Sequence, residues 1–205
     1  MNRAELKFLA KEQIKGNIGI LFVISLIIAL INGVAGATGL GSLLSIFLLA
    51  PAFTMAVTKI YLRLVKGTKP ELADLFAEFS NFWPMFKVTF LTGLYTFLWS
   101  LLFIIPGYIK ALSYSQARFV IAENPDITAT EAIERSKEMM EGHKMELFVL
   151  QLSFFGWYIL VALTLGLAGI YADPYINATL VNFYNKIKPV EAAVQTPQDP
   201  IAIEE

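Results

Sequence analysis

The chain carries the stretch PGYIKALSYSQAR at residues 106–118, and the same pattern occurs as PAFTMAVTKIYLR at 51–63 and as PYINATLVNFYNK at 174–186. In each copy a proline is followed by a large apolar or aromatic residue at plus two, a small residue at plus five, an aliphatic residue at plus six and a cation at plus twelve. A proline that opens an apolar helix ending in a positive charge is typical of a membrane span returning to the cytoplasm. The three copies therefore predict three helical hairpins.

The composition favours a membrane as the surroundings of this chain. Of the 205 residues, 56% are hydrophobic and only 16% are charged, and the mean hydropathy is +0.59. A soluble domain has about 45–50% apolar residues. The charges are clustered, so the apolar runs between them can cross about 30 Å of hydrocarbon at about 1.5 Å per residue. We interpret the chain as an all-α, polytopic integral membrane protein with six transmembrane helices.

The six spans form three pseudo-repeated units, each an interfacial amphipathic helix followed by a helical hairpin. The units cover about residues 2–66, 67–123 and 124–188, so residues 1–188 form a single membrane domain. Residues 189–205 are expected to be a disordered cytoplasmic tail, because they have little to bury. We place the spans at about 18–34, 43–61, 84–105, 108–122, 146–165 and 167–184, and the interfacial helices at 2–15, 71–80 and 128–140.

Two local signals refine these boundaries. Thr128, with Glu131 three residues on, matches a capping box at the start of the third interfacial helix, and Gly142 matches its end. Pro106 and Pro174 are either hairpin apices or mid-helix kinks. Kinks would leave spans three and five too short, so we favour turns near both prolines.

The distribution of Lys and Arg predicts the orientation. Nearly all of these cations fall at the N-terminus, in the interfacial helices or at the returning ends of the spans, whereas the opposite loops have only Lys110 and Asp173 nearby. By the positive-inside rule both termini are cytoplasmic. A cleaved signal peptide is the alternative for the first span, but its charged region is long and contains Glu5 and Glu12.

A basic stripe runs along the first interfacial helix. Arg3, Lys7, Lys11 and Lys15 recur every four residues, while Leu6, Leu9, Ala10 and Gln13 lie largely on the other side. The stripe is either a contact with the membrane surface or a solvated face.

A candidate polar centre lies within the predicted spans. Lys110 and Asp173 fall near the outer ends of spans four and six, and the polar residues Ser113, Gln116 and Asn177 follow on the same two helices. Charges in hydrocarbon are costly and face partners or a watery cavity, so we expect Lys110 and Asp173 to form an ion pair. The centre is either purely structural or a polar cavity for a lipid headgroup or a solute.

Several site types are excluded or disfavoured. The chain has no cysteine, which excludes disulfides and thiolate chemistry, and its single histidine, His143, excludes a multi-histidine zinc site. We expect no catalytic residue, no cofactor and no metal, and no nucleic-acid binding because there is no recognisable module for it.

Several motifs together resemble one known family. They are IPGYIKALSYS at 105–115, EAI at 131–133 with Ser136, MEGHK at 140–144, the opening RAELK at 3–7 with KGN at 15–17, and PY at 174–175 with ATL at 178–180. The chain is similar over residues 2–188 to a family of bacterial multi-span proteins known as domain of unknown function nine-seven-five. That family is distantly similar to the membrane domain of some glycerophosphodiester phosphodiesterases, which implies a membrane-embedded module and carries no catalytic residues.

The functional expectation is a non-enzymatic membrane module that binds lipids or a partner membrane protein. The alternative is a small transporter or lipid-handling carrier with a polar centre between spans four and six. The sequence does not indicate an oligomeric state.

The predicted topology is testable with single cysteines, because the chain has none of its own. A cysteine at Thr38 should react with an impermeant thiol reagent added to intact cells, whereas cysteines at Thr68 and Thr130 should react only after permeabilisation. Labelling at Thr130 in intact cells would contradict six spans with both termini inside.

Overall fold

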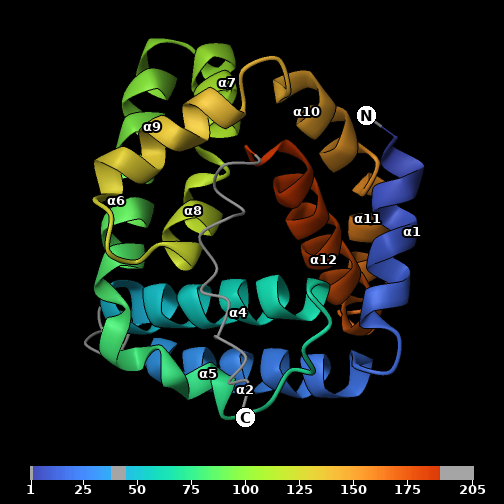
Figure 1. Ribbon diagram of the computed structural model, residues 1–205. Helices are drawn as coiled ribbons and strands as arrows, with labels where there is room; N and C mark the ends of the chain where they lie inside the picture. The colour runs from blue at the N-terminus through green and yellow to red at the C-terminus, as the bar shows by residue number, and fades with distance from the viewer. Residues whose placement is uncertain (1, 38–44, 190–205) are drawn as a thin grey trace, which may run out of the picture.

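The computed structural model describes residues 2–37 and 45–189, and every regular element in these ranges is a helix (Figure 1). The prediction of an all-α chain is therefore confirmed. Within these ranges three helices are long and apolar enough to cross a membrane: Ile18–Gly36, Phe47–Val65 and Lys144–Leu163. The loop between the first two predicted spans and the predicted tail lie largely outside the described residues.

The helices follow one another around a central helix, α4. In chain order they are α1 (Arg3–Ile14), α2 (Ile18–Gly36), the π-helix η1 (Ser45–Leu49), α4 (Ala50–Val65), α5 (Asp74–Ala77), the 3₁₀ turn η2 (Phe79–Asn81), α6 (Trp83–Leu102), α7 (Ile104–Tyr114), α8 (Ala117–Glu123), α9 (Ala129–Met139), α10 (Lys144–Leu152), α11 (Phe155–Leu163) and α12 (Gly169–Ile187). In Figure 1, α6, α8 and α9 lie on one side and α1, α10 and α12 on the other. Helix α4 contacts α5, α6, α8 and α12, so it joins the two sides.

The helix predicted at 128–140 is present as α9. The Thr128 hydroxyl accepts a hydrogen bond from the Glu131 N–H at 3.1 Å, as the capping box requires. The Glu131 carboxylate does not reach back, because it pairs with Arg135 at 2.7 Å. Gly142 follows the helix with a φ of +78°, a left-handed conformation that suits glycine.

The hairpin of α6 and α7 turns at Phe103, which is extended with φ −160° and ψ 147°. Pro106 lies in the first turn of α7, where its missing N–H removes no hydrogen bond of the helix. Gly107 then allows α7 to approach α6 closely. A Cβ on Gly107 would lie 2.1 Å from Ser100 Oγ and 2.8 Å from Ser100 Cα, so only glycine fits at this crossing. The predicted turn near Pro106 therefore falls three residues earlier.

The turn predicted near Pro174 is wrong. Pro174 lies inside α12, five residues after its start at Gly169. The chain reverses instead between Leu163 and Gly169, where Leu165 and Gly166 adopt φ values of +50° and +95°. Two successive left-handed residues end α11 without help from a proline.

One predicted span is broken, and another is interrupted by a short turn. The span expected at 108–122 is divided between α7 and α8. The span expected at 146–165 corresponds to the candidate membrane helix Lys144–Leu163, in which a two-residue turn at 153–154 separates α10 from α11. The interfacial helix expected at 71–80 is reduced to the single turn α5 and the 3₁₀ turn η2. Two acids of this segment pair with cations of α4: Asp74 with Arg63 at 2.9 Å and Glu78 with Lys59 at 2.7 Å.

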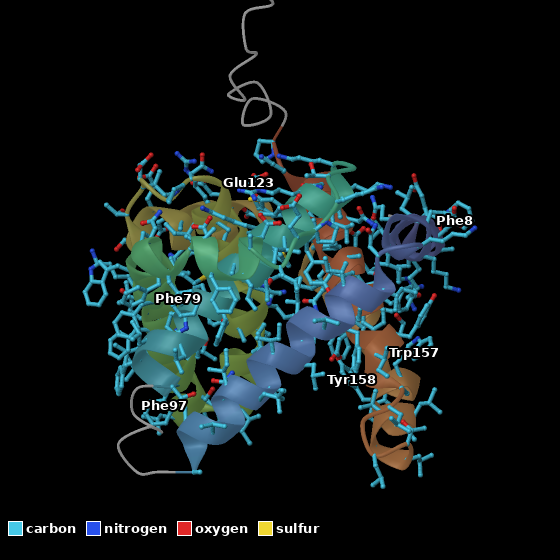
Figure 2. All side chains as sticks on the ribbon, turned by 90° about the horizontal axis from the view of Figure 1, so that it is seen from below. Phe8, Phe79, Phe97, Glu123, Trp157 and Tyr158 are labelled. Atoms are coloured by element: carbon cyan, nitrogen blue, oxygen red, sulfur yellow. The ribbon has the colours of Figure 1, made fainter. Side chains whose placement is uncertain are left out.

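Helix α1 packs on protein through one face. Leu6, Ala10 and Ile14 are at most 1% exposed, and α1 lies against α12. Phe8 and Leu9 are 63% and 41% exposed, and Figure 2 shows Phe8 pointing outward near the same end of the molecule as Glu123. Leu9 was expected on the face opposite the stripe, but only the face of Leu6 docks on the protein.

The four cations of the basic stripe divide into two pairs. Lys7 Nζ lies 4.9 Å from the ring centroid of Phe154, and Lys11 Nζ lies 5.9 Å from that of Tyr175. Burial is the main cause that lowers the pKa of Lys7, and the charges of its basic neighbours add to it. Arg3, Lys11 and Lys15 are all exposed, but no ring contact is recorded for Arg3 or Lys15 within the described residues. Lys7 and Lys11 therefore help to hold α1 on the aromatic rings of α12 and its neighbours.

The docking of α1 is tested by two identical substitutions. Leu6→Ala should lower the free energy of unfolding by about 2–5 kcal/mol, because it leaves a cavity in the contact with α12. Leu9→Ala on the exposed side should change it by about 0.5 kcal/mol or less. Reversible unfolding in detergent measures both, and equal effects would contradict the docking.

Candidate functional site

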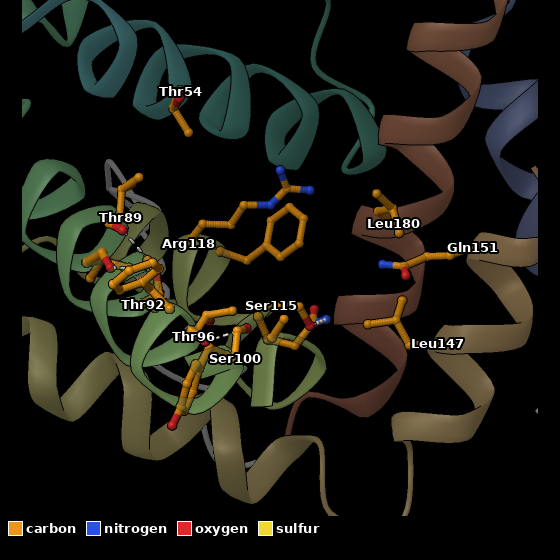
Figure 3. A pocket seen from close by; sticks show the side chains of 17 residues that line it. Thr54, Thr89, Thr92, Thr96, Ser100, Ser115, Arg118, Leu147, Gln151 and Leu180 are labelled. Carbon is orange, nitrogen blue, oxygen red and sulfur yellow. Dashed lines mark hydrogen bonds between the residues drawn. The ribbon is translucent and has the colours of Figure 1, made fainter. Parts of the chain in front are cut away.

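A cavity of about 780 Å³ lies between α4, α6, α7, α8, α10 and α12 (Figure 3). Its lining combines hydroxyl groups with apolar side chains and contains one cation. The residues are Thr54, Val88, Thr89, Thr92, Gly93, Thr96, Phe97, Ser100, Ala111, Tyr114, Ser115, Gln116, Arg118, Phe119, Leu147, Gln151 and Leu180.

The wall formed by α6 is a stripe of hydroxyl groups. Thr89, Thr92, Thr96 and Ser100 are spaced by three, four and four residues, which places them on one face of the helix. The Thr92 and Ser100 hydroxyls each donate to a backbone carbonyl of α6 at 2.8 Å. Their oxygens can still accept hydrogen bonds, whereas no acceptor within the described residues is recorded for the hydroxyls of Thr89 and Thr96, so this wall can both accept and donate.

Arg118 extends from α8 into the space between α4 and α12. Among the described residues no Asp or Glu oxygen lies within 4.0 Å of its guanidinium, and none of its N–H groups has an acceptor within hydrogen-bond distance. Arg118 is the plus-twelve cation of its copy of the repeated pattern. The equivalent cations are both paired, Arg63 with Asp74 at 2.9 Å and Lys186 with Glu5 at 2.8 Å.

Arg118 also borders a second cavity, and this second cavity adjoins a third. The second, of about 280 Å³, shares Thr54, Arg118 and Phe119 with the first. The third, of about 210 Å³, shares Asn177 with the second and reaches Asp173 between α2, α4 and α12. The three cavities therefore adjoin one another in a row.

The break between α7 and α8 is fixed by Ser136 of α9. Its hydroxyl donates to the Ser113 carbonyl at 2.7 Å and accepts from the Gln116 N–H at 3.1 Å, and the side chain is fully buried. One hydroxyl thus satisfies a carbonyl and an N–H that a continuous helix would have paired. The break turns the chain just before Arg118.

The other end of α8 is fixed by Glu123. Its carboxylate accepts hydrogen bonds from Lys188 and, at 2.8 Å, from the Tyr184 hydroxyl, both of the α12 end, and Lys66 Nζ lies 3.5 Å away. Burial raises the pKa of this carboxyl, but the hydrogen bonds from Lys188 and Tyr184 outweigh burial and hold the pKa of Glu123 below its ordinary value. Helix α8 is therefore tied to α4 and α12.

The predicted ion pair of Lys110 and Asp173 is wrong. Lys110 Nζ lies 4.8 Å from the ring centroid of Trp99, and no described acid pairs with it. Helix α7 packs on α6, α9 and α10, so Lys110 is turned away from α12. Asp173 instead lines the third cavity, with Tyr61 nearby.

The other members of the predicted polar centre are spread over the row of cavities. Gln116 lines the first cavity, and Asn177 lines the second and the third. Ser113 lies at the break between α7 and α8, where its carbonyl accepts a hydrogen bond from the Ser136 hydroxyl. The Asn177 amide donates to the Asp173 carbonyl of its own helix at 2.9 Å. Among these residues, Asn177 and Asp173 line the third cavity together.

Comparison with known proteins identifies the family. Residues 1–113 and 104–191 match the family described as Protein of unknown function (DUF975). The chain belongs to this family. No curated protein and no solved structure matches it.

The sequence interpretation of this DUF975 protein missed Arg118 and the hydroxyl stripe. The sequence interpretation grouped Arg118 with the other cations at the returning ends of the spans. Arg118 differs from Arg63 and Lys186 in having no acidic partner in the part of the chain that the structure describes, and this difference is not visible without the folded structure. The spacing of Thr89, Thr92, Thr96 and Ser100 was available as a signal, since polar residues on one face of an apolar helix indicate a polar neighbour or cavity. Within the described residues, no group of three or more Asp, Glu or His side chains is suited to hold a metal ion.

The anchor of α8 should make stability depend on pH. Glu123→Gln should lower the free energy of unfolding by about 1–3 kcal/mol at pH 7, because a buried charge-assisted acceptor is lost. The folded pKa of Glu123 lies below the unfolded value, so its contribution is complete above the unfolded pKa and is lost as pH falls through the folded pKa.

The difference between wild type and Glu123→Gln should therefore shrink on acidification below about pH 4. Glu134→Gln is the control, because Glu134 forms an exposed pair with Lys137, and its effect should stay within about 0.5 kcal/mol. Unfolding in detergent across this pH range measures both, and a constant difference would refute the anchor.

Proposed function

We propose that this protein is a multi-pass membrane protein that binds a lipid in the cavity between α4 and α6 and performs no chemistry on it. The observation that carries the proposal is the cavity itself, about 780 Å³ with a polar wall on α6 and apolar side chains opposite. A cavity of this size and mixed lining suits one amphiphilic molecule.

The membrane placement is part of the proposal. We assign six spans to α2, η1 with α4, α6, α7 with α8, α10 with α11, and α12, arranged in three similar units with both termini cytoplasmic. The exposed apolar side chains of α2, α6 and α11 support this assignment, because lipid would cover them. Figure 2 also shows Glu123 and Phe8 near one end of the molecule and Phe97 near the other, as expected for a cytoplasmic and an outer end. A bacterial inner membrane fits this arrangement.

The shape of the site supports a lipid as the ligand. Thr89 and Ser100 are eleven residues apart on α6, so the hydroxyl stripe extends over about 16 Å at about 1.5 Å per residue. Phe97, Leu147 and Leu180 provide apolar surface along the same length. A cavity of this length can hold a lipid headgroup and the first part of an acyl chain.

A non-enzymatic role fits the residues around the cavity. A hydrolase would need a nucleophile within hydrogen-bond reach of a base. His143 pairs with Glu146 at 2.9 Å and is not part of the lining. Binding of a partner membrane protein to the same module, and the distant similarity to the membrane domain of glycerophosphodiester phosphodiesterases, remain predictions.

A small transporter or lipid-handling carrier is the second candidate. The row of three cavities favours it, because the row leads from the hydroxyl stripe past Arg118 and Asn177 to Asp173. Polar residues along such a row are typical of a substrate pathway.

Filling the cavity should displace the lipid. Thr92→Phe adds a ring to the lining, and we expect the purified protein to lose one tightly bound phospholipid, counted by native mass spectrometry. Leu94→Phe is the control, because Leu94 lies on the same helix, is 39% exposed and does not line the cavity. Equal phospholipid counts in wild type and Thr92→Phe, with both proteins folded by thermal unfolding, would refute the proposed site.

A further inference from the structure

We infer that Arg118 and Gln116 form the headgroup end of the cavity and select a phosphate-bearing headgroup that also carries a hydroxyl. The inference rests on the proposed function and adds the chemical class of the ligand. Arg118 lacks an acceptor, and Gln116 lacks a donor, so together they define what the ligand supplies.

The guanidinium of Arg118 is suited to bind an anion. This group always carries a charge and five N–H donors. The side chain is partly buried, with its Cζ 4.5 Å from the ring centroid of Phe119, a contact that uses none of these donors in a hydrogen bond to an oxygen. Arginines at such sites commonly pair with a carboxylate or a phosphate. Two of the three equivalent cations in the repeated pattern have such a partner within the chain, at 2.9 Å and 2.8 Å. The third faces two cavities instead. The planar fork of donors matches two oxygens of a phosphate, the commonest anion at a membrane surface.

The side-chain oxygen of Gln116 is suited to accept a hydrogen bond from a ligand. Its side chain is 2% exposed and lines the same cavity, and its Oε1 has no hydrogen-bond partner among the described residues. The orientation of the amide is fixed by its neighbour. The Ser115 hydroxyl gives its proton to the Leu112 carbonyl at 2.7 Å, so its oxygen can only accept from Gln116 Nε2, at 2.8 Å. Oε1 is therefore the free end of the amide, and a hydroxyl would satisfy it.

The headgroup end has further hydroxyl groups at hand. Thr89 on α6 and Thr54 on α4 line the same cavity as Arg118, and Figure 3 shows the arginine side chain extending toward α4. The Thr54 hydroxyl donates to the Ala50 carbonyl at 2.7 Å, which leaves its oxygen as an acceptor for a polyol hydroxyl. A glycerol phosphate group offers both the anion and the hydroxyls, whereas a choline headgroup adds a cation and no donor.

The test compares three phospholipids with identical acyl chains: phosphatidylglycerol, phosphatidylmethanol, which is anionic without a hydroxyl, and phosphatidylcholine. Competition for the purified protein, read by native mass spectrometry, should rank them in that order for wild type. Arg118→Gln should reduce both anionic lipids to the level of phosphatidylcholine, a loss of about tenfold or more, since a charge-assisted contact is removed. Gln116→Leu should make phosphatidylglycerol equal to phosphatidylmethanol and leave both above phosphatidylcholine.

Controls separate this inference from the proposed function. Arg135→Gln removes a cation paired on the exposed face of α9 and should leave the ranking unchanged. If Arg118→Gln still binds one phospholipid but without preference, both proposals hold. If it retains the wild-type ranking while the cavity-filling variant loses its lipid, only the headgroup inference is overturned. A wild type that binds phosphatidylglycerol and phosphatidylmethanol equally overturns the role of Gln116.

A soluble competitor identifies the source of the headgroup. Glycerol 1-phosphate that displaces phosphatidylglycerol at millimolar concentration assigns the site to a free polyol phosphate, and no displacement assigns it to the lipid. Arg118→Lys keeps the charge and should restore part of the anion preference, which a purely structural arginine would not do. Thermal unfolding of every variant in the same detergent confirms that each is folded.

Discussion

The site depends on a single buried hydroxyl group. Ser136 of α9 bridges the carbonyl of Ser113 and the N–H of Gln116, and so holds open a break in what the apolar pattern presents as one helix. An unpaired carbonyl or N–H in an apolar interior costs free energy, so the break exists only because another element satisfies it. The amphipathic helix α9 is therefore a structural part of the cavity, although it contributes no lining residue to it.

The break and the anchor at Glu123 together set the position of α8. One end of this short helix is held by α9 and the other by Lys188 and Tyr184 at the end of α12. A helix of two turns has little stability of its own, so tertiary contacts determine where it lies. Arg118 lies between these two attachments. The position of its guanidinium at the cavities is therefore determined by residues that do not line the cavities. Substitutions at Ser136 or Glu123 would thus act on the site without touching a ligand.

The sequence predicted local features well and relative positions poorly. The Thr128 cap, the end of α9 at Gly142 and the apolar helices all follow from short-range patterns. The pair of Lys110 and Asp173 was inferred from equal depth along two helices, but depth does not specify rotation about the helix axis. The break between α7 and α8 and the turn between α10 and α11 were not predicted because no Pro or Gly marks them. The break near Ser113 depends on a side chain twenty residues or more away in sequence.

The three copies of the repeated pattern show how one sequence motif acquires different roles. Each copy ends in a cation twelve residues after its proline, and in the first and third copies the folded chain supplies an acid to that cation. In the second copy no such acid is present among the described residues, and the cation faces empty volume. An anion that binds there compensates the charge only in the folded state. Binding and folding are therefore thermodynamically linked, and a tenfold excess of ligand over its dissociation constant would stabilise the protein by about 1.4 kcal/mol. Within the described residues the Arg118 guanidinium has only the Phe119 ring, at 4.5 Å, as a partner, and this is why we propose that its counter-charge comes from a bound ligand.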